Sequence, residues 1–172
     1  ALRVAVSAGA EESRWAAVAR VDALVGLAAD GLGIGDFAGS ARLLERAAAE
    51  SAGTVSTAAR GNWVLDGRPA LRLAWVRTEL ALYTGRSDAA DLAARALELS
   101  AGAPSVRHRL KTALIAAAAD AASGRVEAAA QTARNVAGDC AAAGLAPLEW
   151  AARSMLASFA ADRDEQSRAA AA

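Results

Sequence analysis

Apolar residues recur at intervals of three and four along most of the chain, which is the pattern of helices that pack on a core. In the first such stretch, from Glu11 to about Gly31, the recurring residues are Trp15, Val18, Val21, Val25 and Leu32. No segment alternates apolar and polar residues for more than a few positions, so we predict no β-sheet.

Glycine, proline and capping residues divide the rest of the chain into further predicted helices. These are expected at about 36–47, 70–84, 88–99, 105–122, 126–143 and 147–161, and an eighth is expected to begin in the polar stretch 162–168. Asp36 and Ser87 are candidate N-caps, and Ser105 opens the helix after Pro104. The glycine-rich segment 53–69 is expected to be an irregular insertion, although residues 55–59 could also extend the second helix.

The predicted helix at 70–84 carries apolar residues on two sides. One stripe is Leu71, Trp75 and Leu82, and the other is Leu73, Val76, Leu80 and Tyr83. A helix that is apolar on two sides is expected to be covered on two sides.

A short motif recurs between predicted helices. It reads Gly35-Asp36-Phe37-Ala38, then Gly85-Arg86-Ser87-Asp88-Ala89-Ala90, then Gly124-Arg125-Val126-Glu127-Ala128-Ala129. Gly85 and Gly124 are 39 residues apart, and a further 39 residues lead to Arg163, where the last helix is expected to open. Since glycine tolerates a left-handed turn, each motif predicts a helical hairpin, and such hairpins must stack to bury both faces.

These features resemble tetratricopeptide repeats (TPRs), in the degenerate form found in large LuxR-type bacterial regulators. The best match is 75–99, which carries Ala74-Trp75, Leu80-Ala81, Gly85-Arg86, Ala89-Ala90 and Ala96-Leu97-Glu98-Leu99 in and just before it. The resemblance implies an all-α, right-handed solenoid of about 3.5 antiparallel hairpins in a single domain, 1–172. Its units would be 11–52, 70–102, 105–143 and 147–172.

The resemblance also implies a function and a binding groove. The function is a non-catalytic protein–protein interaction module of a larger cytoplasmic regulatory or signalling protein, with transcriptional regulation as one context. Because the first helix of each TPR lines the concave side, eight residues are expected to face a peptide or protein partner there. They are Arg72, Trp75, Glu79, Leu82, Arg107, His108, Lys111 and Leu114, and Ala118 continues their stripe. Packing of Trp75 between helices, and a solvated basic cluster at Arg107, Arg109 and Lys111, are the alternatives.

The composition limits the kinds of binding surface and site that the chain can carry. Of 172 residues, 53 are Ala, a strong helix former, and the formal net charge of zero disfavours a broad nucleic-acid or membrane-binding surface. One Cys and one His exclude a disulfide framework and a multi-histidine metal site. We expect Cys140, Trp63 and Trp150 to fill the core, and Gly31–Gly35 to be a poor phosphate loop. The sequence therefore predicts no enzyme, cofactor, metal site or catalytic residue.

Three alternatives to the interaction module remain. The Ala-rich helices could enclose an apolar pocket that senses a small molecule, or the chain could be an enzyme of unfamiliar type. It could also self-associate through unsealed solenoid ends. Because the chain begins in the middle of an apolar pattern, we expect it to be a fragment of a longer protein, whose other domains are also possible partners.

Overall fold

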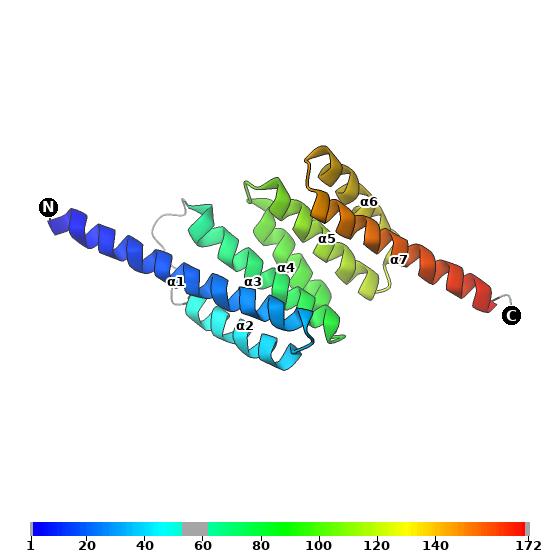
Figure 1. Ribbon diagram of the computed structural model, residues 1–172, viewed down its shortest axis with the longest axis horizontal. Helices are drawn as coiled ribbons and strands as arrows, with labels where there is room; N and C mark the ends of the chain where they lie inside the picture. Colours follow the sequence, from blue (N-terminus) through cyan, green and yellow to red (C-terminus); the bar gives the residue numbers. More distant parts are fainter. Residues whose placement is uncertain (1, 53–61, 171–172) are drawn as a thin grey trace.

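The computed structural model describes residues 2–52 and 62–170, and within them the chain is entirely helical, as predicted. The seven helices are α1 (Leu2–Gly33), α2 (Phe37–Ala52), α3 (Trp63–Tyr83), α4 (Ala89–Ala101), α5 (Val106–Ala122), α6 (Val126–Ala142) and α7 (Ala146–Ala170). They follow one another as a row, and the free ends of α1 and α7 project at opposite ends of the molecule (Figure 1).

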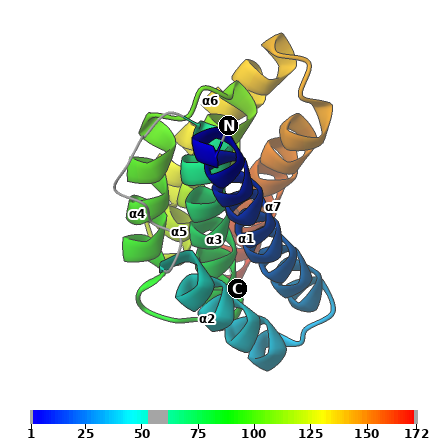
Figure 2. The ribbon, with the colours of Figure 1, turned by 90° about the vertical axis from the view of Figure 1, so that its left-hand side faces the viewer.

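Each described helix contacts only the next one or two helices along the chain. The pairs α1–α2, α3–α4 and α5–α6 pack closely, and α7 packs on α6. The odd-numbered helices also contact one another in order, whereas no two even-numbered helices touch within the described part of the chain. Figure 2 looks along the row from the α1 end and shows α2 and α4 to one side of α1. The packing is therefore local in sequence.

The three predicted glycine turns close with the same pair of hydrogen bonds. Gly85 has a φ of 64°; its N–H donates to the Leu82 carbonyl (3.3 Å), and the Arg86 N–H donates to the Ala81 carbonyl (2.9 Å). Gly35 and Gly124, with φ of 80° and 81°, repeat both bonds at the same spacings. This is the Schellman ending, which requires a left-handed residue and so favours glycine. The prediction of left-handed turns is confirmed.

A fourth turn of this kind lies at Gly144, where the sequence predicted only the end of a helix. Its φ is 67°, and the Leu145 N–H donates to the Cys140 carbonyl at 2.8 Å. This turn leads from α6 into α7, whereas the other three connect the two helices of a pair.

The predicted caps are partly correct. The Asp36 carboxylate accepts the Gly39 N–H (2.8 Å) at the start of α2, as expected. Ser87 does not cap α4, because that helix begins at Ala89 and Asp88 occupies the N-cap position. The carboxylate of Asp88 accepts a hydrogen bond from Arg86 Nε (3.0 Å) instead of from the helix. Ser105 does occupy the N-cap position of α5.

Three predicted boundaries are wrong. The first helix begins at Leu2 and not at Glu11. The irregular segment 53–69 is helical from Trp63 onward, because Asn62 caps α3 by accepting the Val64 N–H (3.1 Å) and the side chains of Leu65 and Pro69 are buried. The rest of that segment, 53–61, lies outside the described residues. The predicted eighth helix is a continuation of α7, since no glycine stands at Arg163 to end the helix there.

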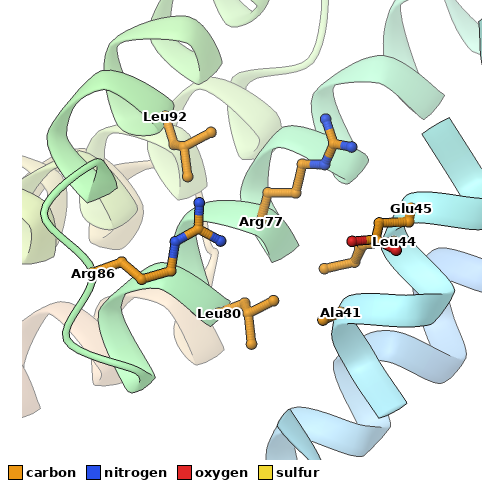
Figure 3. Close-up of a pocket in the computed structure, with 7 residues that line it drawn as sticks. All are labelled: Ala41, Leu44, Glu45, Arg77, Leu80, Arg86 and Leu92. Carbon is orange, nitrogen blue, oxygen red and sulfur yellow. The ribbon is translucent and has the colours of Figure 1, made fainter. Parts of the chain in front are cut away.

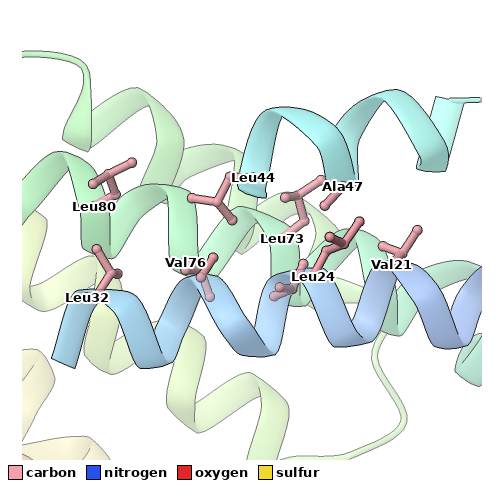
Figure 4. Packing of buried hydrophobic residues seen from close by; sticks show 10 residues of the cluster. Val21, Leu24, Leu32, Leu44, Ala47, Leu73, Val76 and Leu80 are labelled. Atoms are coloured by element: carbon pink, nitrogen blue, oxygen red, sulfur yellow. The ribbon is translucent and has the colours of Figure 1, made fainter. Parts of the chain in front are cut away.

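The core is divided into clusters that consecutive helices share. One cluster joins α1, α2 and α3, and another joins α3, α4 and α5 through Leu71, Trp75, Ala96 and Ile115. Figure 4 shows the first of these, with Leu73, Val76 and Leu80 facing α1 and α2. Helix α3 is thus covered on both sides, as its two apolar stripes predicted. Two further clusters join α5, α6 and α7.

Candidate functional site

The eight predicted groove residues lie on α3 and α5 and separate into a basic group and an apolar group. Arg72, Arg107, His108 and Lys111 occupy the N-terminal halves of these two helices, and Trp75 lies just past the middle of α3. Glu79, Leu82 and Leu114 lie further along and line an apolar hollow.

Trp75 is not a groove residue, and this prediction is wrong. Its side chain packs in the cluster between α3, α4 and α5, and the residue is 5 % exposed. Its indole N–H donates to the Thr112 hydroxyl (2.8 Å), and that hydroxyl donates to the His108 carbonyl (2.8 Å). Lys111 lies over the indole ring, with Nζ 4.7 Å from the ring centre. Trp75 therefore joins α3 to α5, as the alternative interpretation held.

His108 is half-buried between two tryptophans. Its ring stacks on Trp75 (centroids 5.4 Å apart, planes at 25°) and meets Trp63 edge to face (4.7 Å, 88°). Its Nδ1 lies 2.8 Å from the Ser105 hydroxyl oxygen. Burial lowers the pKa of His108 below its ordinary value, and the neighbouring cations Arg68, Arg107, Arg72 and Lys111 lower it further. The imidazole is thus held in its neutral form near pH 7, and no carboxylate is bonded to it among the described residues.

The four cations that surround His108 form what we call the basic patch: Arg68, Arg72, Arg107 and Lys111. Arg68 and Arg72 both bind the Asp22 carboxylate of α1, Arg72 at 2.6 Å. Lys111 lies 3.5 Å from a Glu79 oxygen. Arg107 is exposed, and no acceptor binds it within the described residues. Four cations and two carboxylates give the patch a net positive charge on a chain whose formal charge is zero.

Beyond the Lys111–Glu79 pair lies what we call the apolar hollow. It has a volume of about 550 Å³ and is lined by α3, α5 and α7. Its lining residues are Glu79, Leu82, Tyr83, Leu114, Ile115, Ala118, Ala151 and Met155. Tyr83 stands at its rim, 64 % exposed, and stacks on Phe37 (5.9 Å between centroids).

The sequence identified part of this hollow. Glu79, Leu82 and Leu114 were predicted from the stripe along each helix, and Ala118 continues it. The contribution of α7 was missed, although Ala151 and Met155 are four residues apart and so share one face of that helix. Tyr83 was assigned to a covered stripe, but it is the last residue of α3 and is 64 % exposed.

A second, smaller hollow lies between α2, α3 and α4 (Figure 3). It has a volume of about 280 Å³, with Leu44 and Leu80 among its lining residues. Arg77, Arg86 and Glu45 also line it. Because Arg86 already binds Asp88 and charges of both signs line the space, this hollow has no evident preference for a charged ligand.

The remaining candidate residues carry no chemistry of their own. Cys140 is fully buried, and burial raises the pKa of its thiol, with Asp139 and Glu149 adding to the shift, so it fills the core as predicted. Trp63 packs in the core as expected, but Trp150 is 73 % exposed on α7, contrary to the prediction. Gly31 and Gly33 lie inside the end of α1.

Among the residues whose side chains the structure describes, no three or more His, Cys, Asp and Glu gather into a group that could hold a metal ion. None of the described helices combines the length and the apolar character needed to cross a lipid bilayer. No protein-family model matches the chain, and no curated protein or solved structure matches it either.

Proposed function

We propose that the chain is a TPR-like right-handed α-solenoid that acts as a protein–protein interaction module. Two features support the architecture. The contacts between helices are confined to near neighbours in sequence, as in repeat proteins, and the paired helices are joined by equivalent Schellman turns. The odd-numbered helices then correspond to the inner helices of the repeats, and the even-numbered helices to the outer ones.

The observation that carries the function is the apolar hollow across α3, α5 and α7. It is built from three successive inner helices, which is the surface that a solenoid offers to a partner. Tyr83 is exposed there, while Leu114 and Ile115 form a buried floor, and an aromatic side chain at such a place supplies binding energy once a partner excludes water from it. The mechanism is binding of a partner by a preformed surface, with no covalent step and no cofactor.

The TPR resemblance extends the proposal to the context of the chain. It suggests a module within a larger bacterial regulatory or signalling protein of the cytoplasm, with transcriptional regulators as the first class to consider. A DNA-binding or ATPase motif in the sequence that flanks this segment in its gene would support that context.

A photo-crosslinking experiment tests the function. We expect a benzoylphenylalanine residue placed at Tyr83, in the full-length protein in its own cells, to form adducts with another protein or with another domain of the same protein. The matched control places the same residue at Leu97, which is 44 % exposed on α4. An absence of protein adducts at Tyr83, or equal yields at the two positions, would contradict the proposal.

A small-molecule sensor is the second candidate, because about 550 Å³ is a volume typical of ligand pockets. Such pockets bury most of the ligand surface, whereas the rim residue Tyr83 remains largely exposed here. The open rim therefore favours a polypeptide. Thermal shifts with a panel of apolar compounds and no adduct at Tyr83 would favour the sensor instead.

A further inference from the structure

We infer that the partner segment bound by this face carries an apolar side chain for the hollow and, at a defined distance along the chain, acidic residues for the basic patch. This inference rests on the proposed function and names the chemistry of its partner. It follows from the way that two different surfaces meet on α3 and α5.

The two surfaces are contiguous. Glu79 lines the hollow and lies 3.5 Å from Lys111, which belongs to the basic patch. Lys111 lies over the Trp75 ring, on which His108 also stacks, and the charges of Arg68, Arg72 and Arg107 act on His108. A bound segment that leaves the hollow toward the N-terminal ends of α3 and α5 therefore meets the cations directly.

The charge of the patch selects acidic residues. Asp22 is shared by Arg68 and Arg72, and Glu79 is the carboxylate nearest to Lys111, so two carboxylates serve four cations. Arg107 is exposed and has no acceptor among the described residues, so it is open to a carboxylate from outside. His108 adds no charge near pH 7, because burial and the cations lower its pKa.

The geometry also sets a spacing. Arg72 and Leu82 are ten residues apart on α3, a separation of about 15 Å along the helix axis. In an extended peptide this distance corresponds to about four or five residues. The partner should therefore separate its apolar anchor from its acidic residues by roughly that number.

Blocked, fluorescein-labelled peptides test this spacing by fluorescence anisotropy. Each probe carries a Leu-Leu pair and a Glu-Glu-Glu block, separated by one, four or ten Gly/Ser residues, in both chain directions. We expect a probe with the four-residue spacer to bind most tightly. Replacing its Glu-Glu-Glu block by Lys-Lys-Lys, or its Leu-Leu pair by Ser-Ser, should weaken binding at least about tenfold. No binding of any acidic probe, equal binding of the Lys probe, or tightest binding with the one-residue spacer would overturn the inference.

Variants of the protein identify the surface. We expect Arg107→Glu and Ala118→Glu each to weaken binding about tenfold, the first at the basic patch and the second in the hollow. Arg134→Glu, an exposed charge reversal on α6, should change it less than about twofold. Circular dichroism checks the fold of each variant, and Tyr83→Ser replaces Ala118→Glu if the latter does not fold. Equal effects of Arg107→Glu and Arg134→Glu would overturn the inference.

The two proposals can fail separately. Protein adducts at Tyr83 together with no acidic-probe binding would leave the interaction module in place and remove only the acidic partner. No adducts at Tyr83 would remove the interaction module itself.

Discussion

Between α3 and α5, the Trp75 indole, the Thr112 hydroxyl and the His108 carbonyl form a continuous series of hydrogen bonds. Each buried polar group in this series has a partner, so Trp75 is buried without the cost of an unsatisfied indole N–H. The His108 ring also stacks on the Trp75 ring. Of the residues that the sequence suggested for binding, Trp75 thus joins two helices, and the His108 ring stacks on it.

The protonation of His108 should make the stability of this joint depend on pH. Burial and four neighbouring cations lower the pKa of His108 in the folded state below its value in the unfolded chain, about 6.5. Between the two pKa values the unfolded chain binds the proton and the folded protein does not, so the free energy of unfolding decreases as the pH falls from neutral. Below the folded-state pKa the decrease from this group stops.

Thermal melting of the wild type and of His108→Phe between pH 7.5 and 4.5 checks this prediction. Phenylalanine keeps the stacking on Trp75 but cannot bind a proton. The melting temperature of the wild type should therefore fall relative to that of the variant as the pH drops below 6.5. All other titrating groups are common to both proteins. A difference in melting temperature that stays constant over this range would contradict the assignment.

Residue types and spacings predicted where the conspicuous side chains lie along the helices, but not which of them a neighbour covers. Arg72, Trp75, Glu79 and Leu82 do share one stripe of α3, yet Trp75 is buried while Leu82 lines a hollow. The difference arises from Thr112 and Lys111 of α5, and their position depends on how the two helices pack. Trp150 was predicted to fill the core but is exposed, because it lies on a part of α7 that no described helix covers.

At the scale of the helix, the entry into α3 depends on close contact between Trp63 and Gly67. A Cβ atom at Gly67 would lie 2.5 Å from Cδ1 and 2.6 Å from Nε1 of the Trp63 ring, which is itself packed against His108. Although Ala normally stabilises a helix by about 0.5–1 kcal/mol over Gly, we expect Gly67→Ala to destabilise the protein by about 1–3 kcal/mol. Urea unfolding measures the change.

Gly138→Ala in α6 provides the matched control. Nothing lies within 4 Å of a Cβ atom at Gly138, and the residue is exposed, so the same substitution should stabilise the protein by about 0.5–1 kcal/mol. Stabilisation by both substitutions would mean that the Trp63 ring is free to move and does not hold the start of α3.

Helices were predictable wherever a single local signal decides their ends. Gly35, Gly85 and Gly124 each end a helix because the turn needs a left-handed residue, and that requirement is visible in the sequence. The start of α3 was missed because Gly67 and Pro69 are helix breakers on average. Their effect is outweighed here by the Asn62 cap and by burial of Leu65, of which only the cap is a local signal.

For the whole molecule, the local packing has a thermodynamic consequence. No contact within the described residues links α1 or α2 to α5, α6 or α7, so stability is transmitted along the row only between helices that are one or two apart in the sequence. The solenoid that we propose would behave as a sum of local terms and open from either end, whereas a closed bundle would lose all of its helices together.

Two cavity-forming substitutions at opposite ends distinguish these behaviours by hydrogen exchange. Leu44→Ala removes a 2 % exposed side chain from the cluster of α1, α2 and α3, and Phe159→Ala removes the aromatic ring from a cluster of α5, α6 and α7. Each should lower the local free energy of unfolding by about 2–5 kcal/mol.

Leu44→Ala should increase amide exchange mainly in α1 and α2, and Phe159→Ala mainly in α6 and α7. Because α3, α4 and α5 keep one intact neighbouring cluster in either variant, they should retain most of their protection. Equal loss of protection in all seven helices would identify a single cooperative core and count against the solenoid.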